Sequence, residues 1–148
     1  MKGKYFKLPI FIICIIIVQT MNKTVYEMPS NNKGTWEIAA KKGDTISIKI
    51  RGNKTTGYSW YLANREQLSQ NIIKPLNLDQ HGSTTNYMMD ENPEHLMGVG
   101  GYFYFDFQIP ENIENQVVDL EFLHKRPWEP EAHSKTIVKL SIGEKTEL

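Results

Sequence analysis

Two adjacent threonines, Thr55 and Thr56, are the first side chains in this sequence whose types and spacing suggest a chemical role. They lie in a short polar turn, Asn53-Lys54-Thr55-Thr56-Gly57-Tyr58. Each threonine supplies a hydroxyl that donates and accepts hydrogen bonds, a methyl group and a stiff χ1 rotamer. Such a tip suits a surface that contacts another molecule, although a turn that only connects two strands could have the same residues.

A glycine-rich stretch, Gly98-Val99-Gly100-Gly101, is the second candidate. It precedes a predicted strand rather than a helix, so it does not fit the dinucleotide-binding fingerprint. Adjacent glycines permit positive φ angles and close approach of another backbone. The stretch therefore suits either a loop pressed against a partner's main chain or a tight start to a strand.

The third candidate is Arg126-Pro127-Trp128, in a loop that is otherwise rich in charge. Pro127 fixes its own φ angle and stiffens the loop. Tryptophan and arginine are the residue types enriched at interface hot spots. The alternative is structural: Trp128 would fold back over a sheet edge, with Arg126 in a surface ion pair.

The sequence lacks the common patterns of catalytic and metal sites. It has no Gly-x-Ser-x-Gly elbow and no phosphate-binding glycine loop, and its one cysteine, Cys14, lies near the N-terminus. The four histidines are scattered without an i,i+2 or i,i+4 pair, namely His81, His95, His124 and His133. We therefore expect no enzymatic activity, no cofactor and no metal.

Composition bounds the remaining classes. The chain has 148 residues, a length that predicts one domain. Its 17 basic and 17 acidic residues give a formal net charge of zero, without the clustered basic stripe that nucleic-acid binding needs. Hydrophobic residues make up 40 %, which is enough for a core.

Period-2 alternation on both sides of the threonine turn predicts the elements that position it. Ile46, Ile48 and Ile50 share one face before the turn, and Tyr58, Trp60 and Leu62 share one face after it. The same reading predicts strands over residues 36–40, 44–51, 58–63, 76–78, 102–110, 117–124 and 136–142. Many short strands and no strong long helix predict an all-β fold, a β-sandwich. Residues 65–73 suggest a single helical turn or an irregular connection.

Residues 79–101 form the longest irregular segment of the predicted fold. Loops of this length in compact domains are usually functional or disordered. Four pliable apolar side chains argue against disorder, namely Met88, Met89, Leu96 and Met97. They could meet a partner, but we expect them to tuck beneath the loop.

Residues 1–22 have the pattern of a secretory signal peptide. Lysines precede an apolar run over residues 8–18, which is too short for the roughly 20 apolar residues of a membrane span. An uncleaved anchor is the alternative. Cleavage would leave a domain over residues 23–148 with no cysteine and no membrane segment, and we expect it to act as a monomer in the secretory pathway.

Two further signals bear on that route. Lys145-Thr146-Glu147-Leu148 differs at one position from the Lys-Asp-Glu-Leu retrieval signal, so the chain is expected in the endoplasmic reticulum lumen, in vesicles or outside the cell. Asn22 and Asn53 each begin a glycosylation sequon. Competition from a tight turn favours an unmodified Asn53, and glycosylation that tunes binding is the alternative.

The three candidate loops occur together in one order, Asn-x-Thr-Thr-Gly-Tyr, then Gly-x-Gly-Gly before an aromatic strand, then Arg-Pro-Trp. This resembles the chagasin family, proteinaceous inhibitors of papain-like cysteine proteases, over residues 36–142. The resemblance implies an immunoglobulin-like β-sandwich with the three loops side by side, as a wedge over the protease cleft. Carried over, the protease-binding residues are Asn53, Thr55, Thr56, Gly57, Tyr58, Gly98, Gly100, Gly101, Arg126, Pro127 and Trp128, with Thr55 and Thr56 at the catalytic cysteine and histidine.

Lys54 departs from the family, which commonly has proline at this position. Proline would stiffen the loop and lower the cost of ordering it on binding, and it would also forbid the Asn53 sequon. A different class of function also remains open at this point. A secreted sandwich with an exposed Trp128 could bind carbohydrate or act as an adhesion module.

Overall fold

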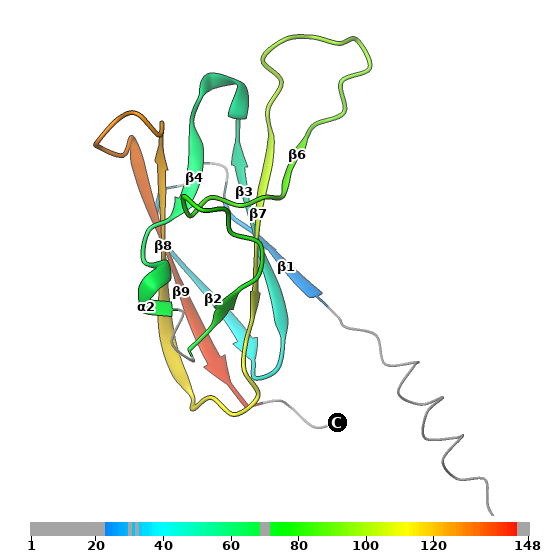
Figure 1. Cartoon of the computed structure of the whole chain (residues 1–148). Helices are drawn as coiled ribbons and strands as arrows, with labels where there is room; N and C mark the ends of the chain where they lie inside the picture. Colours follow the sequence, from blue (N-terminus) through cyan, green and yellow to red (C-terminus); the bar gives the residue numbers. More distant parts are fainter. Residues whose placement is uncertain (1–22, 30, 32, 69–71, 145–148) are drawn as a thin grey trace, which may run out of the picture.

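The computed structural model describes residues 23–29, 31, 33–68 and 72–144, which form two packed β-sheets (Figure 1). The expected signal peptide, the Asn22 acceptor and the retrieval-like tail lie outside these residues. One sheet contains β1 (Lys23–Glu27), β3 (Thr45–Gly52), β7 (Gly101–Gln108), β5 (Lys74–Pro75) and β6 (Tyr87–Met89). The other contains β2 (Gly34–Lys41), β9 (Ser134–Gly143), β8 (Gln116–Lys125) and β4 (Ser59–Leu62). The all-β sandwich prediction is confirmed.

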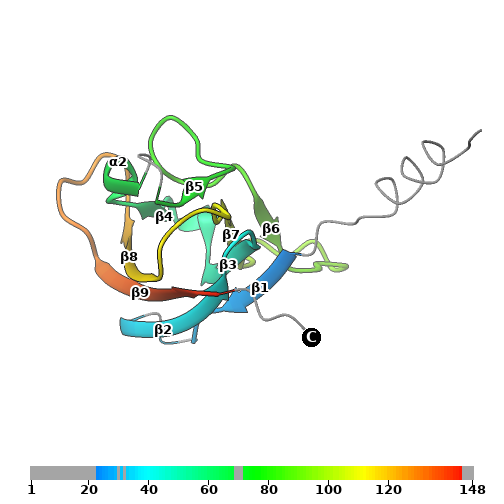
Figure 2. The same ribbon diagram turned by 90° about the horizontal axis from the view of Figure 1, so that it is seen from below.

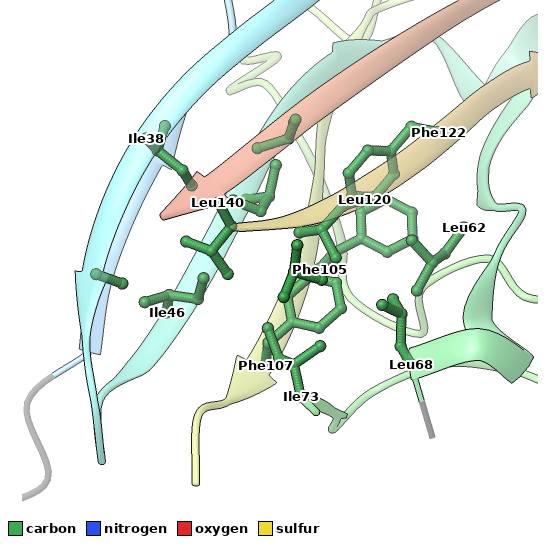
Figure 3. Packing of buried hydrophobic residues seen from close by; sticks show 14 of the residues in the cluster. Ile38, Ile46, Leu62, Leu68, Ile73, Phe105, Phe107, Leu120, Phe122 and Leu140 are labelled. Carbon is green, nitrogen blue, oxygen red and sulfur yellow. The ribbon is translucent and has the colours of Figure 1, made fainter. Parts of the chain in front are cut away.

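The core lies between the two sheets because the inward faces of the strands are apolar. Ile46, Ile48 and Ile50 of β3 are fully buried, as are the phenylalanines of β7 that pair with them across the ladder. Figure 3 shows Ile46, Phe105 and Phe107 among the side chains of β8 and β9. The rings of Phe105 and Phe122 pack edge to face, with their centres 4.9 Å apart. Each such side chain contributes about 1.5–3 kcal/mol on burial.

Most predicted strands are present, and three elements differ from the prediction. Strand β6 lies within residues 79–101, which were expected to be irregular. The strand expected over residues 76–78 lies instead at Lys74–Pro75, where it pairs with the end of β7. Strand β1 was not predicted because it is short and exposed, so it shows no alternation; it pairs in parallel with β3 at the sheet edge. The expected helical turn is present as α2 (Arg65–Leu68). No helix in the described residues is long and apolar enough to cross a membrane.

The expectation that four apolar side chains tuck beneath the long loop is wrong. Met88, Met89, Leu96 and Met97 are 57–98 % exposed. Leu96 and Met97 lie in the connection between β6 and β7, which projects beyond the end of the sandwich in Figure 1, so no second layer lies under it. Met88 and Met89 lie on β6 itself, with their side chains exposed. Figure 2 views the molecule from the opposite end, with α2 and β1 on different sides.

Candidate functional site: three loops at one end of the sandwich

Three loops meet at one end of the sandwich (Figure 1). The threonine loop, residues 53–58, crosses from β3 to β4 and therefore from one sheet to the other. The glycine loop, residues 90–100, connects β6 to β7, and the tryptophan loop, residues 126–133, connects β8 to β9. The threonine loop stands between the other two, and hydrogen bonds join it to both.

The threonine loop is shaped by its first residue, Asn53. Its side chain caps a short 3₁₀ helix, η1 (Lys54–Thr56): Oδ1 accepts from the backbone N of Thr55 at 3.1 Å and from Thr55 Oγ1 at 2.6 Å. Thr56 Oγ1 donates to the Asn53 carbonyl at 2.7 Å. Gly57 ends the turn with a φ angle of 85°, a left-handed conformation that favours glycine. Both threonine side chains remain exposed at the tip.

The glycine loop is tied to the threonine loop by Asn53, whose Nδ2 donates to the Gly98 carbonyl at 2.8 Å. At the base of the loop, Arg51 forms an ion pair with Asp90 through two contacts of 2.7 and 2.8 Å. The hydrogen bond from Arg51 lowers the pKa of Asp90 below its ordinary value, so this pair stays charged at neutral pH. Asp90 N–H also donates to the Gly100 carbonyl at 2.9 Å, which closes the loop.

The glycine motif thus divides into two roles. Gly98 and Gly100 lie within the loop, whereas Gly101 is buried at the start of β7. A Cβ atom on Gly101 would overlap the carbonyl oxygen of Met88 and lie 2.8 Å from the Cα of Met89. Gly101 therefore permits the close approach of β6 to β7, and its position favours the tight strand start rather than a surface contact.

The tryptophan loop is tied to the threonine loop by Arg126. Its Nε donates to the Thr56 carbonyl at 3.2 Å, and its guanidinium lies 4.4 Å above the ring of Tyr58. Arg126 also pairs with Glu129 at 3.2 Å. The alternative in which Trp128 folds back over a sheet edge does not hold, because Trp128 is 68 % exposed. One edge of its ring lies close to Gly57, and the Arg126 guanidinium lies 5.7 Å from the ring centre.

An aromatic and histidine cluster supports the loops from below, and the sequence reasoning missed it. His124 stacks on Tyr58 at 4.9 Å and on Trp60 at 4.7 Å, with His133 6.0 Å away. Burial, and then the charge of His133, lower the pKa of His124. From the sequence, the histidines were judged as possible metal ligands and not as stacking partners of aromatic rings. No group of side chains in the described residues could hold a metal ion. The available signal was the strand register, which sets Trp60 opposite His124.

The sandwich presents three joined loops at one end, and loops held on such a scaffold often carry the binding residues of a protein. Chagasin family peptidase inhibitor I42 matches residues 39–142. Amoebiasin-1 of Entamoeba histolytica is 31 % identical to this chain over 106 residues, which cover 72 % of the chain and 86 % of that protein. The chain therefore belongs to the chagasin family of peptidase inhibitors, and it is not an enzyme.

Solved structures share the fold. The cysteine protease inhibitor EhICP2 from Entamoeba histolytica matches with a TM-score of 0.56 at 14 % identity, over 82 % of this chain and 97 % of that one. PbICP-C, solved in complex with falcipain-2, matches with a TM-score of 0.51 at 15 % identity, over 81 % and 99 % of the two chains. The fold is accordingly the immunoglobulin-like β-sandwich that the sequence resemblance implied.

Proposed function

We propose that this chain inhibits papain-like cysteine proteases reversibly, by inserting the threonine loop into the active-site cleft while the other two loops grip its rims. The observation that carries the proposal is the joining of the three loops. Asn53 links the threonine loop to the glycine loop, and Arg126 links it to the tryptophan loop. Loops that are already ordered lose less conformational entropy when they bind.

The threonine tip has the chemistry to meet a thiolate–imidazolium pair. The hydroxyl proton of Thr55 is directed to Asn53 Oδ1, and that of Thr56 to the Asn53 carbonyl. Each hydroxyl oxygen can therefore act outward as an acceptor, although Thr56 Oγ1 also accepts a long bond, 3.4 Å, from Tyr58 N–H. The imidazolium N–H of the protease is the complementary donor. Inhibition would need no covalent bond, because the tip makes hydrogen bonds without placing a peptide carbonyl for attack.

The flanking loops supply the contact area. A stable complex buries about 800 Å² on each partner, more than one short turn can provide. Trp128 on one side, and Leu96 and Met97 on the other, are exposed apolar side chains of 61–98 % accessibility. Burial of these side chains against the rims of the cleft would provide the hydrophobic part of the interface. Pro127 stiffens the tryptophan loop next to its anchor.

We further propose that the inhibitor works in the secretory pathway as a monomer. The lysine-rich start and apolar run of residues 1–22 support export, and the Lys-Thr-Glu-Leu end supports retrieval to the endoplasmic reticulum. Target proteases would then be those that share the lumen, vesicles or extracellular space with it.

Titration of papain and a cathepsin-L-type protease with the purified domain tests the proposal. We expect stoichiometric loss of activity, recovery of activity on dilution, and recovery of the inhibitor as an uncut chain. An excess of folded domain that leaves every papain-like protease in the panel fully active would refute the proposed function. An adhesion module would give that negative result as well.

A further inference from the structure

We propose that Asn53 accepts an N-linked glycan while the chain enters the secretory lumen, and that the modified chain cannot inhibit proteases. The inference rests on the proposed function and on export. The Asn53 side chain has two polar atoms, Oδ1 and Nδ2. They bond to different residues, and these residues are synthesised at different times.

The local turn engages only the oxygen of this side chain. Oδ1 accepts from the backbone and hydroxyl of Thr55, two residues away. Nδ2 is the atom to which a glycan is attached, and in the described structure it donates to the Gly98 carbonyl, 45 residues further along the chain. The tight turn that was expected to shield Asn53 therefore leaves the acceptor atom free until Gly98 arrives.

The topology delays the rest of the shield in the same way. The strands on either side of the threonine loop do not pair with each other. Strand β3 pairs with β7, and β4 pairs with β8, both of which lie later in the sequence. At a synthesis rate of about 5–20 residues per second, 45 residues take roughly 2–9 s to appear. During that time the Asn-Lys-Thr sequon passes the transferase without the contact of Asn53 Nδ2 with Gly98.

The modification is a simple group transfer from a lipid-linked oligosaccharide diphosphate. Asn53 Nδ2 loses one of its two protons to a base of the transferase and forms a bond to C1 of the first sugar. The bond between C1 and the diphosphate oxygen breaks, and the lipid diphosphate leaves with the electron pair. One N–H remains on Asn53. The transfer does not change Oδ1, so this oxygen can still cap η1.

A glycan at this position would occupy the middle of the proposed binding surface. Asn53 Nδ2 points at Gly98, so the sugar would emerge between the threonine loop and the glycine loop. N-linked glycans are bulky and hydrated, whereas the centre of a protein interface is packed as densely as a protein interior. The same covalent group would leave the core, which lies between the sheets, undisturbed. The modified chain would thus be folded and inactive.

Lys54 offers a clean way to remove the sequon. Lys54→Pro forbids modification while keeping Asn53, Thr55 and Thr56. Proline is compatible with this site because Lys54 is the first residue of η1, and Asn53 before it is extended, with φ −127° and ψ 99°. The substitution removes a long contact, 3.4 Å, from Lys54 N–H to the Tyr87 hydroxyl, and the contact of the Lys54 ammonium with the Tyr87 ring at 5.7 Å. Lys54→Ala is the matched control, since it removes the lysine and retains the sequon.

The full chain is expressed with its own leader in eukaryotic cells that glycosylate secreted proteins. Thr24→Ala is included in every variant, so that Asn53 holds the remaining sequon. Thr24 is exposed on β1 and pairs with Ile46 near the end of the sheet opposite the loops. Intact mass is measured before and after an amidase-type glycosidase, which leaves aspartate where a glycan was attached.

We expect Thr24→Ala and its Lys54→Ala derivative to carry a glycan mass that Lys54→Pro lacks. The heavy form should show no inhibition at concentrations where Lys54→Pro inhibits fully. Unmodified mass in the lumen, a chain that never reaches the lumen, or a heavy form that inhibits as well as Lys54→Pro would each overturn the proposal. Chain made in bacteria carries no glycan, so failure of that material to inhibit would refute the proposed function instead.

Discussion

Removal of the Trp128 side chain should weaken protease binding far more than it weakens the fold. Trp128 is 68 % exposed in the free protein, although a tryptophan is one of the most apolar side chains available for a loop. Its remaining contacts are one ring edge near Gly57 and the guanidinium of Arg126, 5.7 Å from the ring. Most of its surface is therefore available to a partner.

The exposed fraction sets the magnitude. A tryptophan side chain offers up to about 250 Å², so about 170 Å² is available, and at about 25 cal/mol per Å² its burial is worth at most about 4 kcal/mol. Hot-spot truncations begin at about 2 kcal/mol. We expect Trp128→Ala to cost about 2–4 kcal/mol of binding free energy, a rise in Kd of about 30- to 700-fold. The area of Trp128 that is buried in the free chain is smaller, about 80 Å², and the unfolded chain already buries part of that area. The substitution should therefore lower the free energy of unfolding by less than it lowers the binding free energy.

The assay pairs inhibition of papain with urea unfolding of the same samples. Val117→Ala is the control, because Val117 is 61 % exposed on β8 at the end of the sandwich away from the loops. That variant should inhibit like the parent chain. The reasoning is refuted if Trp128→Ala binds normally and unfolds at lower urea, since Trp128 would then be a structural side chain.

Three further predictions address the tip, the supporting cluster and the tail. Replacing Thr55 and Thr56 together with glutamate should abolish inhibition with little change in the melting temperature, because both side chains are exposed and the hydrogen bonds that they lose lie within the loop. Unchanged inhibition would mean that another loop enters the cleft. The pKa of His124 lies below its ordinary value of about 6.5, so the unfolded chain takes up the proton first. The free energy of unfolding should therefore be highest above about pH 6.5 and fall as the pH drops below it. In His124→Phe, which keeps a stacking ring, this fall should be smaller. An equal fall in both chains would contradict the role of His124. Deletion of residues 145–148 should increase secretion. Equal secretion with and without these residues would show that they do not act as a retrieval signal.

The strands could be predicted where one face is apolar and the other polar. Phe103, Phe105 and Phe107 alternate with residues that face solvent, so β7 was evident from the sequence. Strand β1 was not evident, because Val25 at its centre is exposed and β3 is the one strand it pairs with in the described sheet. Four apolar residues of the long loop were misplaced because a hydrophobic side chain does not itself reveal whether a second layer covers it.

The candidate site could be predicted as three separate motifs, from their order and their family resemblance. The bonds that join them could not be predicted. Asn53 to Gly98 spans 45 residues and Arg126 to Thr56 spans 70. Such contacts depend on which distant strands pair within each sheet, β3 with β7 and β4 with β8, and no local pattern encodes that pairing. The histidine cluster was missed for the same reason, since His124 meets Tyr58 and Trp60 only through the pairing of β8 with β4.

Binding to a protease whose cleft is already filled tests the central claim most directly. Papain is alkylated at its catalytic cysteine with a peptidyl reagent that occupies the cleft, and the affinity of the unglycosylated domain for this protein is compared with its affinity for papain carrying only a small blocking group. If the threonine loop inserts into the cleft, the filled protease should bind at least about 100-fold more weakly, because the central, fully desolvated contacts are lost. Equal affinity for the two forms would place the interface elsewhere and contradict the account.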